Sequence, residues 1–224
     1  RYEAEEYEEA SSLVERALLL DPACDEARVI QAAVAFVLHD WARAEAAPDL
    51  LSPGASTGLK AEAYYLRGRA KLSHRLDRSA GELRGFPLSE CEAAFQTAFE
   101  TAREARYLAW VGQVQVLAFR DKSATRTLAA ARALDASDPH VRFLAHTLDP
   151  LSEEFDLAEA LSAKETFGSF EFALALAGRL IRAEREPEAQ RILSRLSRMR
   201  PKDGATIHVR QAEAYAQRAG ARSG

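Results

Sequence analysis

The sequence predicts an all-helical chain, and three observations lead to this fold class. Apolar residues recur three and four positions apart along most of the chain, which is the spacing of one face of an α-helix. A pattern of small, bulky and small residues returns several times. No segment alternates polar and apolar residues strictly enough to indicate a β-strand. A hydrophobic fraction of 47% in 224 residues supplies enough apolar material for a core.

The first predicted helix shows this recurring pattern most clearly. Ala10, Val14 and Ala17 lie on one helix face, and the helix should end at Pro22 because proline cannot continue it. The pattern returns, with variation, in three later segments: Cys91, Phe95 and Ala98; Ala124, Leu128 and Ala131; and Ala189, Leu193 and Leu196.

A second pattern places a bulky residue, another bulky residue three positions later, a small residue directly after it, and a large residue three positions beyond. Copies with some departures are Val29, Ala32, Ala33 and Phe36; Tyr64, Arg67, Gly68 and Lys71; Leu108, Val111, Gly112 and Gln115; Val141, Leu144, Ala145 and Leu148; and Ala173, Leu176, Ala177 and Leu180. The copy at 29–36 has a one-residue uncertainty of register. The two patterns are linked, because Gly112 precedes Ala124 by twelve residues and Ala177 precedes Ala189 by the same number.

These patterns predict about 12 helices over the whole chain. The breaks are expected near Pro22, Pro53, 76–87, Ala105, Asp121, Pro139, Pro150, Gly168, Glu186 and Pro201. The segments 48–58 and 76–87 are rich in Pro and Gly and predict loops, the second one an insertion that is either a tolerated surface loop or a functional one. The segment 151–165 predicts a short, irregular helix, and 203–219 predicts a last helix with a polar outer face.

The two patterns resemble the second and first helices of the tetratricopeptide repeat (TPR), with degenerate repeats over essentially the whole chain. The resemblance implies a right-handed α-solenoid of stacked antiparallel helix pairs. Residues 1–224 would form one solenoid domain of about five to six repeats, with the first repeat truncated and 203–219 capping the last. Because the chain begins inside a predicted helix, we expect it to be a fragment of a longer protein.

In the TPR family the first helices of the pairs line a concave groove that holds the ligand. Carried over position by position, the resemblance implies a partner-binding set that includes two flanking residues: Tyr65, Arg69, Arg106, Trp110, Gln113, Arg142 and His146. Arginine pairs with carboxylates and aromatic rings supply contact area, so we expect a protein or peptide partner of acidic character. The alternative is that the arginines only solvate an exposed face and that Trp110 belongs to the core.

The overall charge gives no reason to expect other classes of partner. Lys+Arg number 30 and Asp+Glu number 34, for a net charge of -4, so we expect neither nucleic acid nor direct membrane insertion. The chain contains no Asn, so it lacks the paired asparagines with which some TPR domains grip a C-terminal carboxylate. Arg outnumbers Lys about five to one, which favours a GC-rich bacterial genome, and we expect the cytoplasm rather than the periplasm.

Nothing in the sequence indicates an enzyme, a cofactor or a metal site. The five histidines lack partners at metal-ligand spacing, and there is neither a phosphate-binding glycine loop nor a nucleophile elbow. Cys24 and Cys91 match no metal or redox spacing, and we expect both thiols to be buried.

The leading functional prediction is therefore a scaffold or adaptor that binds a partner protein. One alternative is a structural factor that assembles with copies of itself or with an envelope, pilus or secretion machine, as pilotin-like repeat proteins do. Another is the regulatory segment of a larger signalling or transcription protein. The fold alone does not choose among them.

Overall fold

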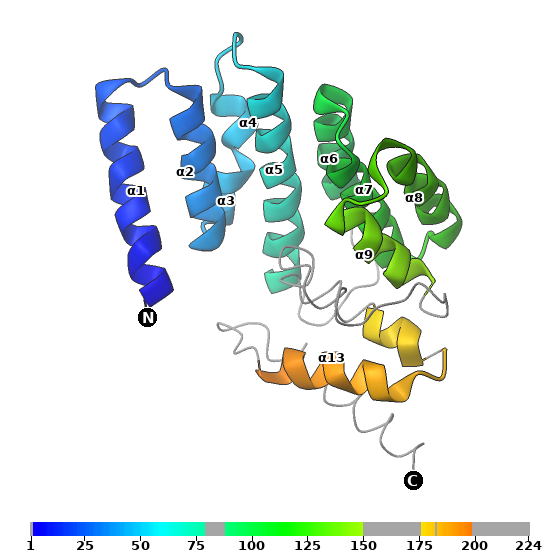
Figure 1. The fold of residues 1–224 in the computed structure, drawn as a ribbon. Helices are drawn as coiled ribbons and strands as arrows, with labels where there is room; N and C mark the ends of the chain where they lie inside the picture. The colour runs from blue at the N-terminus through cyan, green and yellow to red at the C-terminus, as the bar shows by residue number, and fades with distance from the viewer. Residues whose placement is uncertain (1, 79–87, 150–175, 182, 199–224) are drawn as a thin grey trace. The chain divides into compact units, whose positions relative to one another are not determined.

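A computed structural model shows a chain that is helical, with no strand in the part of it that the structure describes, which is residues 2–78, 88–149, 176–181 and 183–198 (Figure 1). The all-α prediction is therefore confirmed. The helices are α1 (Tyr2–Leu20), α2 (Asp25–Val37), α3 (Trp41–Glu45), α4 (Ala47–Leu50), α5 (Thr57–Arg78), α6 (Ser89–Ala102), α7 (Ala105–Leu117), α8 (Asp121–Asp135), α9 (Pro139–Leu148) and α13 (Glu186–Arg198), with a short helix at 176–181 before α13.

Most of the predicted helix boundaries that fall on described residues are correct. Helix α1 ends before Pro22, α8 begins at Asp121, α9 begins at Pro139 and α13 begins at Glu186. The remaining predicted features lie outside the described residues: the breaks at Pro150, Gly168 and Pro201, the helix at 151–165 and the capping helix at 203–219.

Three predictions about connections were wrong or incomplete. The segment 48–58 is not all loop, because Pro48 lies in the first turn of α4, where its missing N–H has no intrahelical partner to lose. Helix α5 continues through Leu76 to Arg78, since no helix breaker occurs before Gly81; residues 79–87 lie outside the described part. The break between α2 and α3 was not predicted.

The chain divides into two compact units. The first contains Arg1–Leu76 and Phe86–Tyr107, and the second contains Asp77–Gly85 and Leu108–Gly224. Helix α7 therefore begins in the first unit and continues in the second.

In the first unit, α2 packs against α1, α3 and α4, and α1 runs antiparallel to α2 (Figure 1). Two small core clusters join α2 to α5. Val29 and Ala32 pack with Ala63 and Leu66 near the start of both helices, and Ala35 packs with Ala70 further along. The contacts follow the same order along both helices, so α2 and α5 run in the same direction. Alanine at many of these positions allows the helices to approach closely.

The same turn ends three helices. After α2, α7 and the helix at 176–181, one residue takes a left-handed backbone conformation, and the next N–H bonds back to the carbonyl oxygen five residues earlier. The turn residues are His39, Phe119 and Glu184, and the bonds are Asp40 to Ala35 at 2.8 Å, Arg120 to Gln115 at 2.8 Å and Arg185 to Leu180 at 2.9 Å. This is the Schellman arrangement. A second helix begins directly after each turn, at Trp41, Asp121 and Glu186.

The turns also fix the register that the sequence left uncertain. Gly112 and Ala177 precede their left-handed residues by seven positions, and in α2 the residue seven positions before His39 is Ala32. Twelve residues beyond Ala32 lies Ala44, which is fully buried, as are Ala124 and Ala189 at the same offset. The twelve-residue spacing therefore occurs a third time, in a hairpin where sequence reasoning missed it.

A different turn recurs after α1 and α8, the helices that match the second pattern. The carboxylate of Asp21 accepts a hydrogen bond from the N–H of Ala23, and the carboxylate of Asp135 accepts one from the N–H of Ser137. Side-chain acceptance two residues on is the Asx turn, which stops a helix without glycine. The bonds to Ser137 lower the pKa of Asp135.

Two glycines mark places where helices lie close together. A Cβ on Gly68 would come within 2.7 Å of the Phe95 ring, which links α5 to α6 in the first unit. A Cβ on Gly112 would come within 2.3 Å of Leu144, which links α7 to α9 in the second unit. Helix α9 also packs against α8.

Candidate functional site

The structure separates the seven predicted binding residues by exposure. Tyr65, Trp110, Gln113 and His146 are buried. Arg69 and Arg106 are partly exposed, and Arg142 is exposed. Only the three arginines therefore present side-chain surface to a partner in this conformation.

Arg69 lies between two aromatic rings in the first unit. It is four residues after Tyr65 on α5, so both side chains lie on the same face of that helix. The guanidinium carbon lies 5.5 Å from the centre of the Tyr65 ring and 4.4 Å from the centre of the Phe36 ring on α2. Such contacts hold a cation by its attraction to the π face and limit its rotamers.

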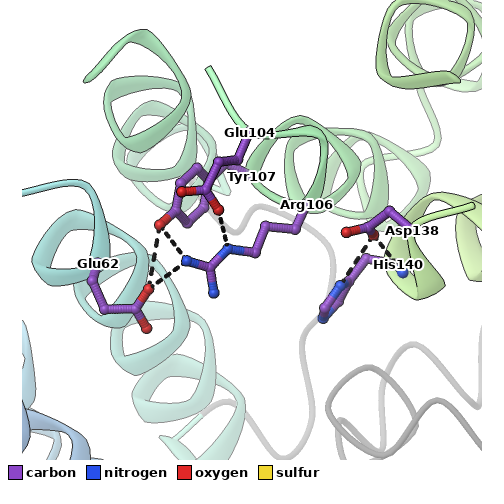
Figure 2. Close-up of polar contacts among 6 residues, drawn as sticks. All are labelled: Glu62, Glu104, Arg106, Tyr107, Asp138 and His140. Carbon is purple, nitrogen blue, oxygen red and sulfur yellow. Dashed lines mark hydrogen bonds and ion pairs between the residues drawn. The ribbon is translucent and has the colours of Figure 1, made fainter. Parts of the chain in front are cut away.

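Arg106, at the start of α7, is held by two carboxylates and a phenol (Figure 2). Its Nη2 donates to Glu62 Oε2 on α5 at 2.9 Å and to the Tyr107 hydroxyl at 2.7 Å, and its Nε donates to Glu104 Oε2 at 2.7 Å. The Tyr107 hydroxyl also donates to Glu62 Oε2 at 3.3 Å. The guanidinium carbon lies 4.5 Å from the Tyr107 ring centre and 5.6 Å from that of Tyr65.

These surroundings shift two pKa values in the cluster. Burial works against the charge of Arg106, but Glu62, Tyr107 and Glu104 outweigh it and raise the pKa of this guanidinium above its ordinary value. Burial is the main cause that raises the pKa of the Tyr107 phenol, and the nearby carboxylates add to the effect while Arg106 opposes it. Around neutral pH the cluster therefore holds a guanidinium cation and a neutral phenol.

Tyr65 joins the two arginines into one continuous arrangement, which we call the arginine ladder: Phe36, Arg69, Tyr65, Arg106 and Tyr107, with the acids Glu62 and Glu104. Tyr65 and Tyr107 also contact each other, with ring centres 5.6 Å apart. The structure thus brings together three of the predicted site residues, Tyr65, Arg69 and Arg106.

The ladder contains residues that sequence reasoning missed as site residues. Phe36 was part of the predicted first-helix pattern, but the register of α2 was uncertain. Glu62 lies three residues before Tyr65 on α5, so the helical spacing alone puts it on the same face. Glu104 precedes α7, and no sequence signal identifies it as a partner of Arg106.

The other predicted residues belong to the second unit and lie mostly in its interior. Trp110 contacts the His140 ring, with ring centres 6.3 Å apart, and Asp138 caps the start of α9 (Figure 2). The Gln113 amide is fully buried, and neither its oxygen nor its nitrogen has a hydrogen-bond partner in the part of the chain that the structure describes. Burial of an unpaired amide is unfavourable, which makes Gln113 a local weak point of this unit.

The thiol and metal predictions have different outcomes. Cys91 is buried, as predicted, but Cys24 is half-exposed because it lies in the turn before α2. Among the residues with described positions, no group of three or more His, Cys, Asp or Glu side chains could hold a metal ion. No helix in the same part of the chain has the length and apolar character needed to cross a bilayer.

Comparison with known proteins identifies no relative. The sequence matches no protein-family model and no curated protein. The repeat interpretation therefore depends on the residue pattern and on the geometry of the helix pairs.

Proposed function

We propose that this chain is a TPR-like helical scaffold, a right-handed α-solenoid of stacked helix pairs, that binds a protein or peptide partner and does not act as an enzyme. The observation that supports it best is the recurrence of one hairpin design. Three helix pairs share the same Schellman turn and the same twelve-residue spacing of small buried residues. Stacked units of this kind cannot bury their apolar faces alone, and their side-by-side first helices form an extended binding surface.

Within this scaffold we assign the acidic contact of the partner to Arg69. Its guanidinium is oriented by the rings of Phe36 and Tyr65, so less side-chain entropy is lost on binding. Arg106 is a poorer candidate, because Glu62 and Glu104 already offset its charge. A partner carboxylate at Arg69 would make charge-assisted hydrogen bonds.

Selection from a peptide library tests this proposal. A displayed library of helical peptides about 20 residues long, the length at which isolated helices become stable enough to bind without a large ordering cost, is selected against the purified chain. The affinity of an enriched peptide is then measured by fluorescence anisotropy. Arg69→Glu should weaken binding about tenfold or more, whereas Arg126→Glu, a charge reversal on the exposed side of α8, should leave it within about twofold. Equal effects of the two substitutions would contradict the assignment to Arg69, and no enriched peptide at all would contradict the binding function.

One observation favours the alternative of self-assembly. Helix α1 exposes Leu13, Leu19 and Leu20, with 56%, 81% and 89% of their surface accessible. Exposed leucines gathered on one helix are typical of surfaces that associate. Light scattering over a range of concentrations would reveal self-association, and Leu20→Glu should abolish it if α1 forms the contact.

A further inference from the structure

The exposed face of α2 carries an apolar stripe that the core does not use. Ile30 and Val37 have 51% and 40% of their surface exposed, and Ala33 lies between them and is partly exposed. The core positions of the same helix, such as Val29, Ala32 and Ala35, point elsewhere and are buried. We call Ile30, Ala33 and Val37 the α2 stripe.

The spacing of the α2 stripe is that of a seam between two helices. Its residues are three and four positions apart, and Glu26 precedes Ile30 by four, so all four side chains lie along one line on the helix. An apolar line of this period accepts the ridge of a second helix packed at a small angle. A lone exposed Leu or Val is ordinary, but a line of apolar residues on one helix face is typical of a contact surface.

Opposite charges lie at the two ends of the α2 stripe. Glu26 is exposed at the N-terminal end of α2. At the other end, Phe36 is the neighbour of Val37, and the Arg69 guanidinium carbon lies 4.4 Å from its ring centre. Glu26 and Phe36 are ten residues apart in one helix, which corresponds to about 15 Å along its axis.

We infer that the α2 stripe docks an amphipathic helix of a partner protein. The apolar ridge of that helix packs on Ile30, Ala33 and Val37, an acidic residue of the partner meets Arg69, and a basic residue about ten positions away meets Glu26. The charges favour one orientation of the partner helix over the reverse, since reversal brings like charges together. This inference rests on the proposed binding function and names the partner's chemistry.

The enriched peptides of the selection described above are the probe for this inference. We expect them to carry an apolar stripe with an acidic and a basic residue about three helical turns apart. The double variant Ile30→Glu with Val37→Glu should weaken their binding about tenfold or more. The matched control, Leu19→Glu with Leu20→Glu, replaces two exposed apolar residues on α1 and should leave the affinity unchanged. All four side chains are exposed, so circular dichroism should show the same helix content in both variants.

A charge exchange tests the orientation. Changing the acidic residue of an enriched peptide to Lys should weaken binding to the wild-type chain, and Arg69→Glu should restore the affinity for the changed peptide. Saturable binding that survives the Ile30 and Val37 substitutions would overturn this inference and leave the proposed function standing. Absence of any binding peptide would overturn both. A dimer of the wild-type chain that dissociates on these substitutions would also overturn it, because the occupant of the stripe would then be a second copy.

Discussion

The hairpin formed by α2, α3 and α4 and the hairpin formed by α7 and α8 share a turn but differ in the second helix. Both turns have a left-handed residue, His39 or Phe119, and both place a fully buried alanine twelve residues after a small residue of the first helix. In one hairpin the second helix is the continuous α8 of 15 residues. In the other, α3 stops after 5 residues and α4 begins around Pro48.

The difference separates local from non-local causes of structure. The turn needs only a short backbone segment, so it forms in both hairpins. The length of the second helix depends on Pro48, because proline lacks the N–H that would bond to the carbonyl group of Ala44. The first hairpin then replaces the lost helix with side-chain contacts: Asp25, at the start of α2, accepts hydrogen bonds from the backbone N–H and the hydroxyl of Ser52.

The largest expected effect comes from enlarging the buried alanines. Ala124→Leu should destabilise the chain by about 3 kcal/mol, because α8 packs continuously and leaves no room for the added atoms. Ala44→Leu should cost less, about 1 kcal/mol, since the short α3 can shift. Urea denaturation followed by circular dichroism measures both. Equal costs would show that the break at Pro48 does not loosen the first hairpin.

Exchanging the small residues of the first helices sharpens the same comparison. Gly112→Ala gives α7 the residue that α2 has at this position, and its Cβ would lie 2.3 Å from the buried Leu144 side chain. The crowding should outweigh the gain in helix propensity and leave a net cost of about 1 kcal/mol. Ala32→Gly should also destabilise, by about 1 kcal/mol, because glycine lowers helix propensity. A stabilising Gly112→Ala would mean that Leu144 moves aside freely.

The left-handed turn residues should respond differently to glycine. Phe119 has a φ of 57° and is 86% exposed, so Phe119→Gly removes backbone strain and should stabilise the chain by up to about 1 kcal/mol. His39→Gly should gain less, because the His39 ring contacts the Trp41 ring with centres 4.7 Å apart. Thermal unfolding of both variants measures the difference, and Glu184→Gly in the third turn is the matched control. A larger gain at His39 would contradict this explanation.

The smallest expected effect is a pH dependence at Asp25. Hydrogen bonds from the Ser52 hydroxyl and N–H lower the pKa of this carboxyl in the folded chain. A lowered folded pKa means that the stabilisation is present above the unfolded value of about 3.9 and is lost as the pH falls through the folded value. Asp25→Asn should therefore lower the unfolding midpoint at pH 7, and the difference from wild type should shrink below about pH 4.

A matched control for this prediction is Asp135→Asn. Asp135 bonds to Ser137 within its own turn, whereas Asp25 joins α2 to a segment 27 residues away. The effect at pH 7 should therefore be smaller for Asp135. A constant difference between wild type and Asp25→Asn from pH 7 to pH 3 would show that the charge of Asp25 does not contribute.

Part of the candidate site could be predicted from spacing and part could not. Tyr65 and Arg69 lie on one face of α5 because they are four residues apart, and the pattern of α5 is clear enough to identify both. Arg106 was predicted as a free cation of the groove, but its pairing with Glu104 and Glu62 depends on the turn before α7 and on how that turn meets α5. The burial of Trp110, Gln113 and His146 likewise depends on neighbouring helices and not on their own.

The sequence by itself determined the helical class, most of the boundaries in the described residues, and the twelve-residue spacing, because these depend on local periodicity and on where proline and small residues fall. The tertiary structure decided the register of α2, the split of the second helix at Pro48, the exposure of the α2 stripe and the charge environment of Arg106. Each of these results from contacts between residues that are distant in sequence, and one chain pattern is compatible with more than one set of such contacts.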